Sequence, residues 1–249
     1  MSKINALKKI LSDMLFPQSF TCDICGIETF DGNICPVCLK TVTFNNGTTC
    51  PVCGRKTDRP EICLECKAAT PRFKKGISPL VYNGGAVALI AKYKNGYGYL
   101  KEYFADLICR KLENLPKADC IVYIPMTKKS VHKRGYNQAE LLAKSISDRT
   151  QTPVLKDGLL KAKETAAQKS LSKKERATNL EDCFKVHDRK QIKDKTILLV
   201  DDVLTTGATA DAACKKLLDA GAKCVYFAAV ASVEFKPFKE KKTAEKPKE

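Results

Sequence analysis

The chain has 249 residues, 44% of them hydrophobic, which is enough for one large domain or two smaller ones with a real core. Its formal net charge is +16, from 44 lysine and arginine residues against 28 aspartate and glutamate residues. No apolar run approaches the ~20 residues of a membrane-spanning helix, so a helical membrane span is excluded.

Residues 1–20 are expected to form a short amphipathic helix. Their apolar residues recur at helical spacing among lysines: Ile4, Leu7, Leu11, Met14 and Leu15. The segment lacks the continuous apolar core of a secretory signal. Docking on the rest of the protein is favoured over attachment to a membrane surface.

Residues 21–68 hold four Cys-x-x-Cys pairs and are expected to bind metal. The pairs are Cys22/Cys25, Cys35/Cys38, Cys50/Cys53 and Cys63/Cys66. Each pair can present two thiolates to a tetrahedral Zn²⁺, and a site closed by four cysteines is structural because no coordination position stays open. The regular spacing favours two zinc sites over disulfides or a redox pair. It also predicts a reducing, cytoplasmic location.

The gaps between successive pairs are nine, eleven and nine residues. The two equal gaps indicate one ribbon unit used twice, with the first two pairs on one zinc and the last two on the other. A cross-braced pairing is the alternative. Because so short a segment has little core, zinc would supply its folding energy.

Charge is distributed unevenly along the chain. The segment from Cys22 to Cys66 has a net charge of −2, so the remainder carries +18. A face that binds polyanions would therefore lie in the C-terminal part. Only eight of the basic residues are arginine, and a lysine-rich solvated surface without such a partner is the alternative interpretation.

Residues 76–234 alternate strands with helices, which predicts an α/β domain with a mostly parallel sheet. A linker is expected over 68–76, a basic loop before residue 136, a mobile loop over 156–179 and a disordered basic tail over 235–249. The predicted strands are 80–82, 120–124, 184–186, 196–200 and 225–233. The predicted helices are 87–94, 100–115, 136–147 and 208–220.

The remaining cysteines lie within these predicted elements and are interpreted as small core residues: Cys109, Cys120, Cys183, Cys214 and Cys224. His132 and His187 are too few and too far apart to indicate a metal site or a catalytic triad.

The most informative stretch is 197–209. A buried strand is followed by Asp201 and Asp202, and then by a threonine and glycine loop, Thr205 to Thr209, that opens a helix. In an open α/β sheet a ligand binds at such a junction. Backbone N–H groups at a helix N-terminus can hold a phosphate, and the carboxylates can accept hydrogen bonds from ribose hydroxyls. The stretch therefore predicts a sugar-phosphate site.

This stretch resembles the phosphoribosyl-pyrophosphate (PRPP) motif of type I phosphoribosyltransferases. Further motifs resemble the ComF family: Leu15-Phe16-Pro17 before the cysteines, Arg134-Gly135-Tyr136-Asn137-Gln138 before a helix, and Thr165, Gln168, Arg176 and Asn179. The resemblance covers nearly the whole chain except the basic tail. It implies a double zinc ribbon ahead of a phosphoribosyltransferase-like domain. It also implies a link to natural competence, in which single-stranded DNA is taken into the cytoplasm.

The resemblance implies roles for individual residues. Asp201 and Asp202 would bind the ribose hydroxyls, the loop would bind the 5-phosphate, and Arg134 would lie near the pyrophosphate. Residues 161–179 would form a flexible hood. The candidate PRPP- and phosphate-binding residues are Val203, Leu204, Thr205, Thr206, Gly207, Ala208, Thr209 and Arg134.

Two features depart from the family pattern. Lysines stand where the family often has arginine: Lys128, Lys129, Lys161 and Lys163. Lysine cannot form a planar bidentate clamp on a phosphate. The Gly-Ala pair usual before Phe184 is also absent.

The resulting prediction is a PRPP-dependent phosphoribosyltransferase of unidentified acceptor. Pyrophosphate would be displaced at the anomeric carbon without a protein nucleophile, and Mg²⁺ would neutralise the leaving group. The alternative is a non-catalytic module on the same fold. Such a module would bind single-stranded DNA through the lysines and arginine of 128–134, or would dock a protein such as a competence helicase through its acidic zinc segment.

Overall fold

The structure is a computed structural model that describes residues 21–29, 34–161 and 183–234. The predicted N-terminal helix, the hood beyond residue 161 and the basic tail lie outside the described residues. Within the described ranges, every helix is too short or too polar to span a bilayer.

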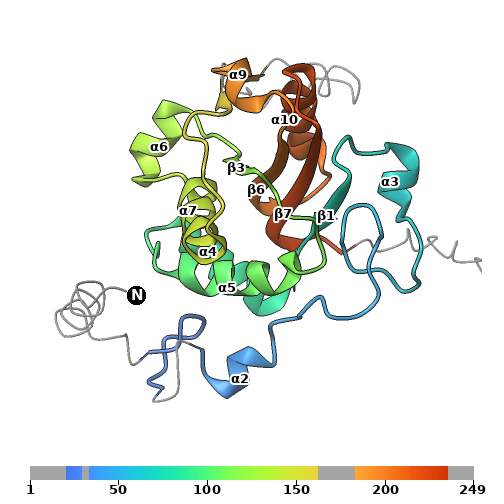
Figure 1. The fold of residues 1–249 in the computed structure, drawn as a ribbon. Coiled ribbons are helices and arrows are strands. Elements are labelled where there is room, and N and C mark those ends of the chain that lie inside the picture. The colour runs from blue at the N-terminus through green and yellow to red at the C-terminus, as the bar shows by residue number, and fades with distance from the viewer. Residues whose placement is uncertain (1–20, 30–33, 162–182, 235–249) are drawn as a thin grey trace, which may run out of the picture.

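A five-stranded parallel sheet forms the centre of the molecule (Figure 1). Its strands are β1 (Lys75–Ile77), β2 (Leu80–Val81), β3 (Cys120–Tyr123), β6 (Thr196–Leu204) and β7 (Cys224–Ser232). The order is β1-β7-β6-β3, and β2 pairs with β7 beyond β1. The central strands β6 and β7 are nearly continuous apolar runs, as expected where both faces of a parallel sheet are covered. The predicted α/β class with a mostly parallel sheet is confirmed.

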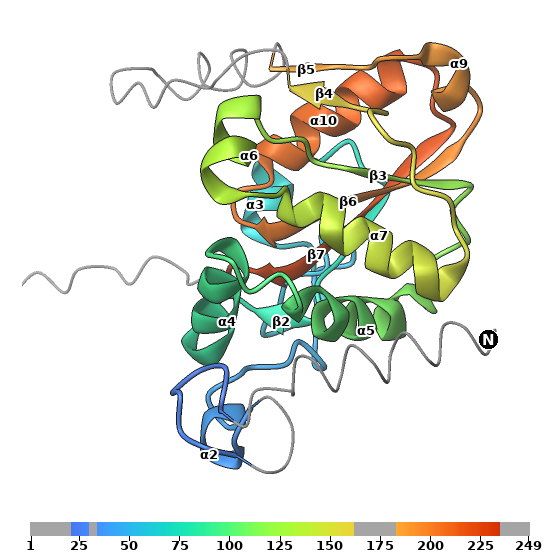
Figure 2. The ribbon, with the colours of Figure 1, turned by 90° about the vertical axis from the view of Figure 1, so that its left-hand side faces the viewer.

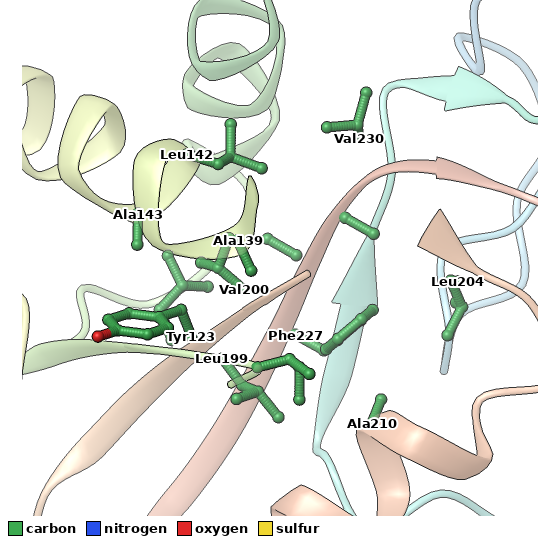
Figure 3. Packing of buried hydrophobic residues seen from close by; sticks show 14 of the residues in the cluster. Tyr123, Ala139, Leu142, Ala143, Leu199, Val200, Leu204, Ala210, Phe227 and Val230 are labelled. Atoms are coloured by element: carbon green, nitrogen blue, oxygen red, sulfur yellow. The ribbon is translucent and has the colours of Figure 1, made fainter. Parts of the chain in front are cut away.

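Helices cover both faces of this sheet (Figure 1). Helices α5 (Leu100–Leu112) and α7 (Gln138–Thr150) pack on one face, α10 (Ala208–Asp219) packs on the other, and α4 (Gly84–Lys94) packs against α5. Figure 3 shows Leu142 of α7 and Ala210 of α10 on either side of the central strands, where Phe227 of β7 is fully buried. The strands are therefore held between two apolar helix layers.

The remaining elements are short. They are α2 (Pro36–Leu39), α3 (Leu64–Ala68), α6 (Lys128–Arg134), α9 (Arg189–Ile192) and the antiparallel pair β4 (Leu160–Lys161) and β5 (Phe184–Lys185). The core positions predicted for the scattered cysteines are confirmed for Cys120, Cys183 and Cys214, while Cys109 and Cys224 are half-buried.

Three sequence predictions are wrong in detail. The basic segment before residue 136 contains α6 and is not a loop, because Thr127 Oγ1 accepts from the Ser130 N–H at 3.2 Å and Gly135 ends the helix at φ +88°. The predicted linker contains the first residues of β1, which pair with β7. Strand β6 continues beyond residue 200 and includes both aspartates.

Candidate functional site

The eight paired cysteines form two groups of four thiols. One group is Cys22, Cys25, Cys35 and Cys38, and the other is Cys50, Cys53, Cys63 and Cys66. Within each group all Sγ atoms lie within 4.8 Å of one another. This is the sequential grouping, so the cross-braced alternative is wrong. We call residues 22–38 the first ribbon and residues 50–66 the second ribbon.

The geometry of both groups fits zinc. Four sulfur ligands at ~2.3 Å from a tetrahedral Zn²⁺ lie about 3.8 Å apart. The Sγ atoms of Cys25 and Cys35 are separated by 3.9 Å, and those of Cys53 and Cys63 by 3.6 Å. Four thiols complete each site, so any zinc held here is structural.

Backbone N–H groups favour the thiolate form in each ribbon. The Cys35 N–H approaches Cys22 Sγ at 3.3 Å, and the Cys63 N–H approaches Cys50 Sγ at 3.4 Å. Although burial opposes ionisation, these and neighbouring N–H groups lower the pKa of Cys22 to about 6 and the pKa of Cys50 to about 7. Both thiols are thus prepared to bind a metal.

The first ribbon docks beside helix α4. The Thr41 carbonyl, just beyond it, accepts from the Gly85 N–H at 3.0 Å, and the Tyr99 hydroxyl donates to the Asp23 carboxylate. Figure 2 shows α2 of this ribbon next to α4. Cys25 is exposed and Cys35 is half-buried, so this metal site lies near the surface.

The second ribbon is part of the main core. Its four cysteines are buried in the same apolar cluster as the sheet. A Cβ on Gly54 would overlap the Gly76 carbonyl oxygen, so the ribbon and β1 meet backbone to backbone. Figure 1 shows α3 of this ribbon on the β1 side of the sheet, away from α2.

The two predicted aspartates lie near the carboxyl end of β6. Asp202 Oδ2 forms an ion pair with Lys94 Nζ of α4 at 2.8 Å, and the Asp202 N–H donates to Asp201 Oδ1 at 2.8 Å. Desolvation and the adjacent Asp202 carboxylate raise the pKa of Asp201 well above its ordinary value. Both carboxyl groups therefore lie at the edge of the sheet where a ligand is expected, and Lys94 neutralises the one on Asp202.

The loop that follows, Thr205 to Thr209, is called the phosphate loop. Gly207 adopts φ +83° at the N-cap of α10, and Thr206 Oγ1 accepts from the Ala208 N–H at 3.3 Å. In the described part of the chain, the N–H groups of Thr205, Thr206 and Gly207 have no hydrogen-bond partner. These donors are the kind that bind an anion at a helix start.

The two residues before the loop have a different role. Leu204 is buried in the core and Val203 packs partly buried against it. Leu204 therefore has only its backbone available to a ligand, whereas the Val203 side chain is partly exposed.

Arg134 ends helix α6 and contacts the start of α7. Its Nη1 donates to Gln138 Oε1 at 2.8 Å. Gln138 is buried, and among the described residues its Nε2 has no partner. Lys128, Lys129 and Lys133 of α6 are exposed. Figure 2 shows α6 toward the same end of the strands as α4 and the start of α10, and this is the end of β6 that carries the aspartates.

Two domain families match the chain. The double zinc ribbon domain matches residues 11–67, and the phosphoribosyl transferase domain matches residues 103–249, which is more than half of the chain. Competence protein F of Haemophilus influenzae is 32% identical over 120 residues, and competence protein ComFC of Bacillus subtilis is 25% identical over 219 residues. The chain belongs to the ComF family.

The ComF relatives are matched over different lengths. The match to ComFC covers 84% of this chain and 82% of that protein, whereas the match to competence protein F covers 48% and 52%. DNA utilization protein YhgH of Escherichia coli K12 is 30% identical over 119 residues, again 48% of this chain and 52% of that protein. The chain thus spans about half the length of competence protein F and of YhgH, and most of the length of ComFC.

Sequence reasoning missed two residues that contact the candidate site. Lys94 and Arg55 contact the aspartates and the phosphate loop from segments more than a hundred residues earlier in the chain. A lysine near a helix end and an arginine two residues after a cysteine carry no signal for these contacts. Their roles depend on tertiary packing.

Proposed function

We propose that this ComF protein binds PRPP with Mg²⁺ at the carboxyl end of β6. The observation that carries the proposal is one continuous segment, in which two adjacent carboxylates precede a loop of unpaired N–H groups at the start of α10. Carboxylates suit ribose hydroxyls, and the N–H groups suit a 5-phosphate. The family assignment supports the same ligand.

Each part of the site would have its own task. Asp201 and Asp202 would hold the ribose, and the phosphate loop would hold the 5-phosphate. The cations of α6 with Arg134 would face the pyrophosphate. Mg²⁺, when bound, supplies positive charge to the leaving pyrophosphate.

Transfer of the ribose phosphate to an acceptor is the enzymatic form of this proposal. The chain's own residues would contribute by fixing both ends of the donor, since placement and electrostatics provide most of the acceleration when no protein nucleophile takes part. Lys94 already neutralises Asp202 at 2.8 Å. We therefore expect Lys94 to turn away or share the carboxylate when ribose binds.

Binding of Mg-PRPP is tested by calorimetry and thermal unfolding. At a hundredfold excess over Kd, the ligand should stabilise the protein by about 2.7 kcal/mol, or about 5–10 °C for a chain of this size. The double variant Asp201→Asn/Asp202→Asn should show no shift. Asp219→Asn, at the exposed far end of α10, is the control and should keep it. Absence of a shift at millimolar Mg-PRPP in the unmodified protein would refute the proposal.

A second proposed function is binding of single-stranded DNA along α6. It is favoured by the exposed lysines of this helix and by the names of the relatives. The prediction that the acidic zinc segment docks a helicase has no comparable observation behind it. The free cysteines suit a reducing compartment such as the cytoplasm.

The DNA proposal predicts a specific change in salt dependence. Replacing Lys128, Lys129 and Lys133 together by glutamine should weaken binding of a short single strand. It should also make the slope of log K against log salt shallower by about two units, since each phosphate contact with a single strand contributes about 0.7. Fluorescence anisotropy at several salt concentrations measures both. A triple variant with the same affinity and slope as the unmodified protein would exclude α6 as the binding surface.

A further inference from the structure

We propose that Arg55 of the second ribbon is a positioning residue that couples this zinc site to the phosphate loop. In this proposal Arg55 fixes the peptide between Thr205 and Thr206 so that the Thr206 N–H is presented to the 5-phosphate. The proposal deepens the PRPP-binding function above and rests on it.

Arg55 is buried, with 2% of its surface exposed, and its guanidinium contacts four groups on two sides. On the ribbon side, Nε donates to Cys53 Sγ at 3.4 Å and Nη1 pairs with Glu65 Oε2 at 2.5 Å. On the sheet side, Nη2 donates to the Thr205 carbonyl at 2.8 Å and Nη1 to the Val233 carbonyl at 3.3 Å. One side chain thus joins a zinc ligand to the segments that follow β6 and β7.

The contact with Thr205 determines the orientation of a peptide group. A trans peptide is planar, so its N–H points away from its carbonyl oxygen. Because the Thr205 carbonyl faces Arg55, the Thr206 N–H faces the opposite side, away from the ribbon. That N–H has no partner in the described part of the chain. The direction of the Thr206 N–H is therefore set by the hydrogen bond that the Thr205 carbonyl, in the same peptide, accepts from Arg55.

The base from which Arg55 reaches is rigid. The Gly54 carbonyl accepts from Asn45 Nδ2 at 2.7 Å, and Gly54 itself is in contact with the backbone of Gly76. Close by, the hydroxyls of Ser78 and Ser232 are 2.7 Å apart. The backbone that carries Arg55 is consequently locked to β1 and to the end of β7. A displacement of the ribbon would be transmitted to the loop by the guanidinium.

A merely space-filling role would not require this side chain. Burying a guanidinium is unfavourable unless its N–H groups are bonded, and an apolar residue of similar volume is often at least as stabilising. The planar fork of arginine instead gives fixed donor directions. A chain of hydrogen bonds from the Cys53 sulfur through the guanidinium to the Thr205 carbonyl also polarises the Thr206 N–H, which strengthens it as an anion donor.

The experiment compares Arg55→Lys and Arg55→Gln with Arg59→Ala, which removes an exposed charge from the same ribbon. Calorimetry on the zinc-loaded full chain measures the affinity of each variant for Mg-PRPP, for ribose 5-phosphate and for Mg-pyrophosphate. We expect the Arg55 variants to lose about tenfold or more in affinity for the two ligands that carry a 5-phosphate, as for loss of a charged hydrogen bond. Pyrophosphate affinity and zinc content should stay unchanged, and Arg59→Ala should behave like the unmodified protein.

Backbone hydrogen exchange of residues 203–209 gives a second measurement that needs no ligand. It should be faster in Arg55→Lys than in Arg59→Ala at equal zinc content. If the unmodified protein fails to bind Mg-PRPP, the proposed function falls and this exchange comparison alone decides the coupling. The coupling is overturned by unchanged affinity and exchange in both Arg55 variants. Loss of zinc from both variants, or an equal loss for all three ligands, would also overturn it because Arg55 would then only support the fold.

Discussion

Replacing Cys63 by serine is expected to destabilise the whole protein, whereas replacing Cys35 by serine is expected to affect only the first ribbon. The two cysteines hold equivalent positions in the two ribbons, but Cys63 is buried in the core of the sheet and Cys35 is half-buried near the surface. Structural zinc contributes about 10–16 kcal/mol of binding free energy in small zinc domains. If the second ribbon loses only a small part of this binding free energy, about 4 kcal/mol, the protein is destabilised by the same amount. The melting temperature should then fall by at least about 8 °C.

Differential scanning calorimetry with zinc analysis distinguishes the two outcomes. Cys63→Ser should retain one zinc per chain and show a single transition at a much lower temperature. Cys35→Ser should also retain one zinc, but its main transition should stay within a few degrees of the unmodified protein. Equal falls in melting temperature for the two variants would contradict the assignment of the second ribbon to the main core. A treatment that removes both ions should resemble Cys63→Ser.

The main elements of the fold are predictable because their signals are local. Strands β6 and β7 are long apolar runs, and α5, α7 and α10 have apolar residues at helical spacing. Helix α6 lacks an apolar face and has no buried residue, so periodicity could not reveal it. Its capping residues, Thr127 and Gly135, were the available signal. Strand β1 is three residues long and contains a glycine, which makes its sequence indistinguishable from a linker.

The candidate site also has parts that the sequence predicts and parts that only the structure shows. The cysteine pairs and the segment from Asp201 to Thr209 each place their chemistry within a few residues, so the sequence alone indicates both. The contacts of Lys94 with Asp202 and of Arg55 with Thr205 join distant segments, and only the packed structure shows them. These distant cations also change the interpretation of the site. The aspartates and the loop form one unit with α4 and the second ribbon.

Asp201→Asn is expected to stabilise the ligand-free protein while removing its affinity for Mg-PRPP. Desolvation and the Asp202 carboxylate raise the pKa of Asp201 in the folded state, so the folded protein binds this proton more tightly than the unfolded chain does. Stability from this group is present at low pH and is lost as pH rises from the unfolded value through the raised folded value. At neutral pH an ionised Asp201 is therefore unfavourable for folding, and asparagine removes that charge. Asparagine also keeps an oxygen that can accept from the Asp202 N–H.

The same pKa shift acts in the opposite direction on ligand binding. A ribose hydroxyl is held best by an ionised carboxylate, so the affinity of the unmodified protein for Mg-PRPP should increase as pH rises through the raised pKa of Asp201. Asp201→Asn should stay without measurable affinity across the same pH range. Asp202→Asn is the matched comparison, because it leaves Lys94 without its partner and should give no gain in stability. Thermal unfolding and calorimetry across pH measure both effects. The prediction is that the charge on Asp201 binds the ribose and opposes folding, so removing it should raise the melting temperature. A lower melting temperature for Asp201→Asn at neutral pH would contradict this prediction.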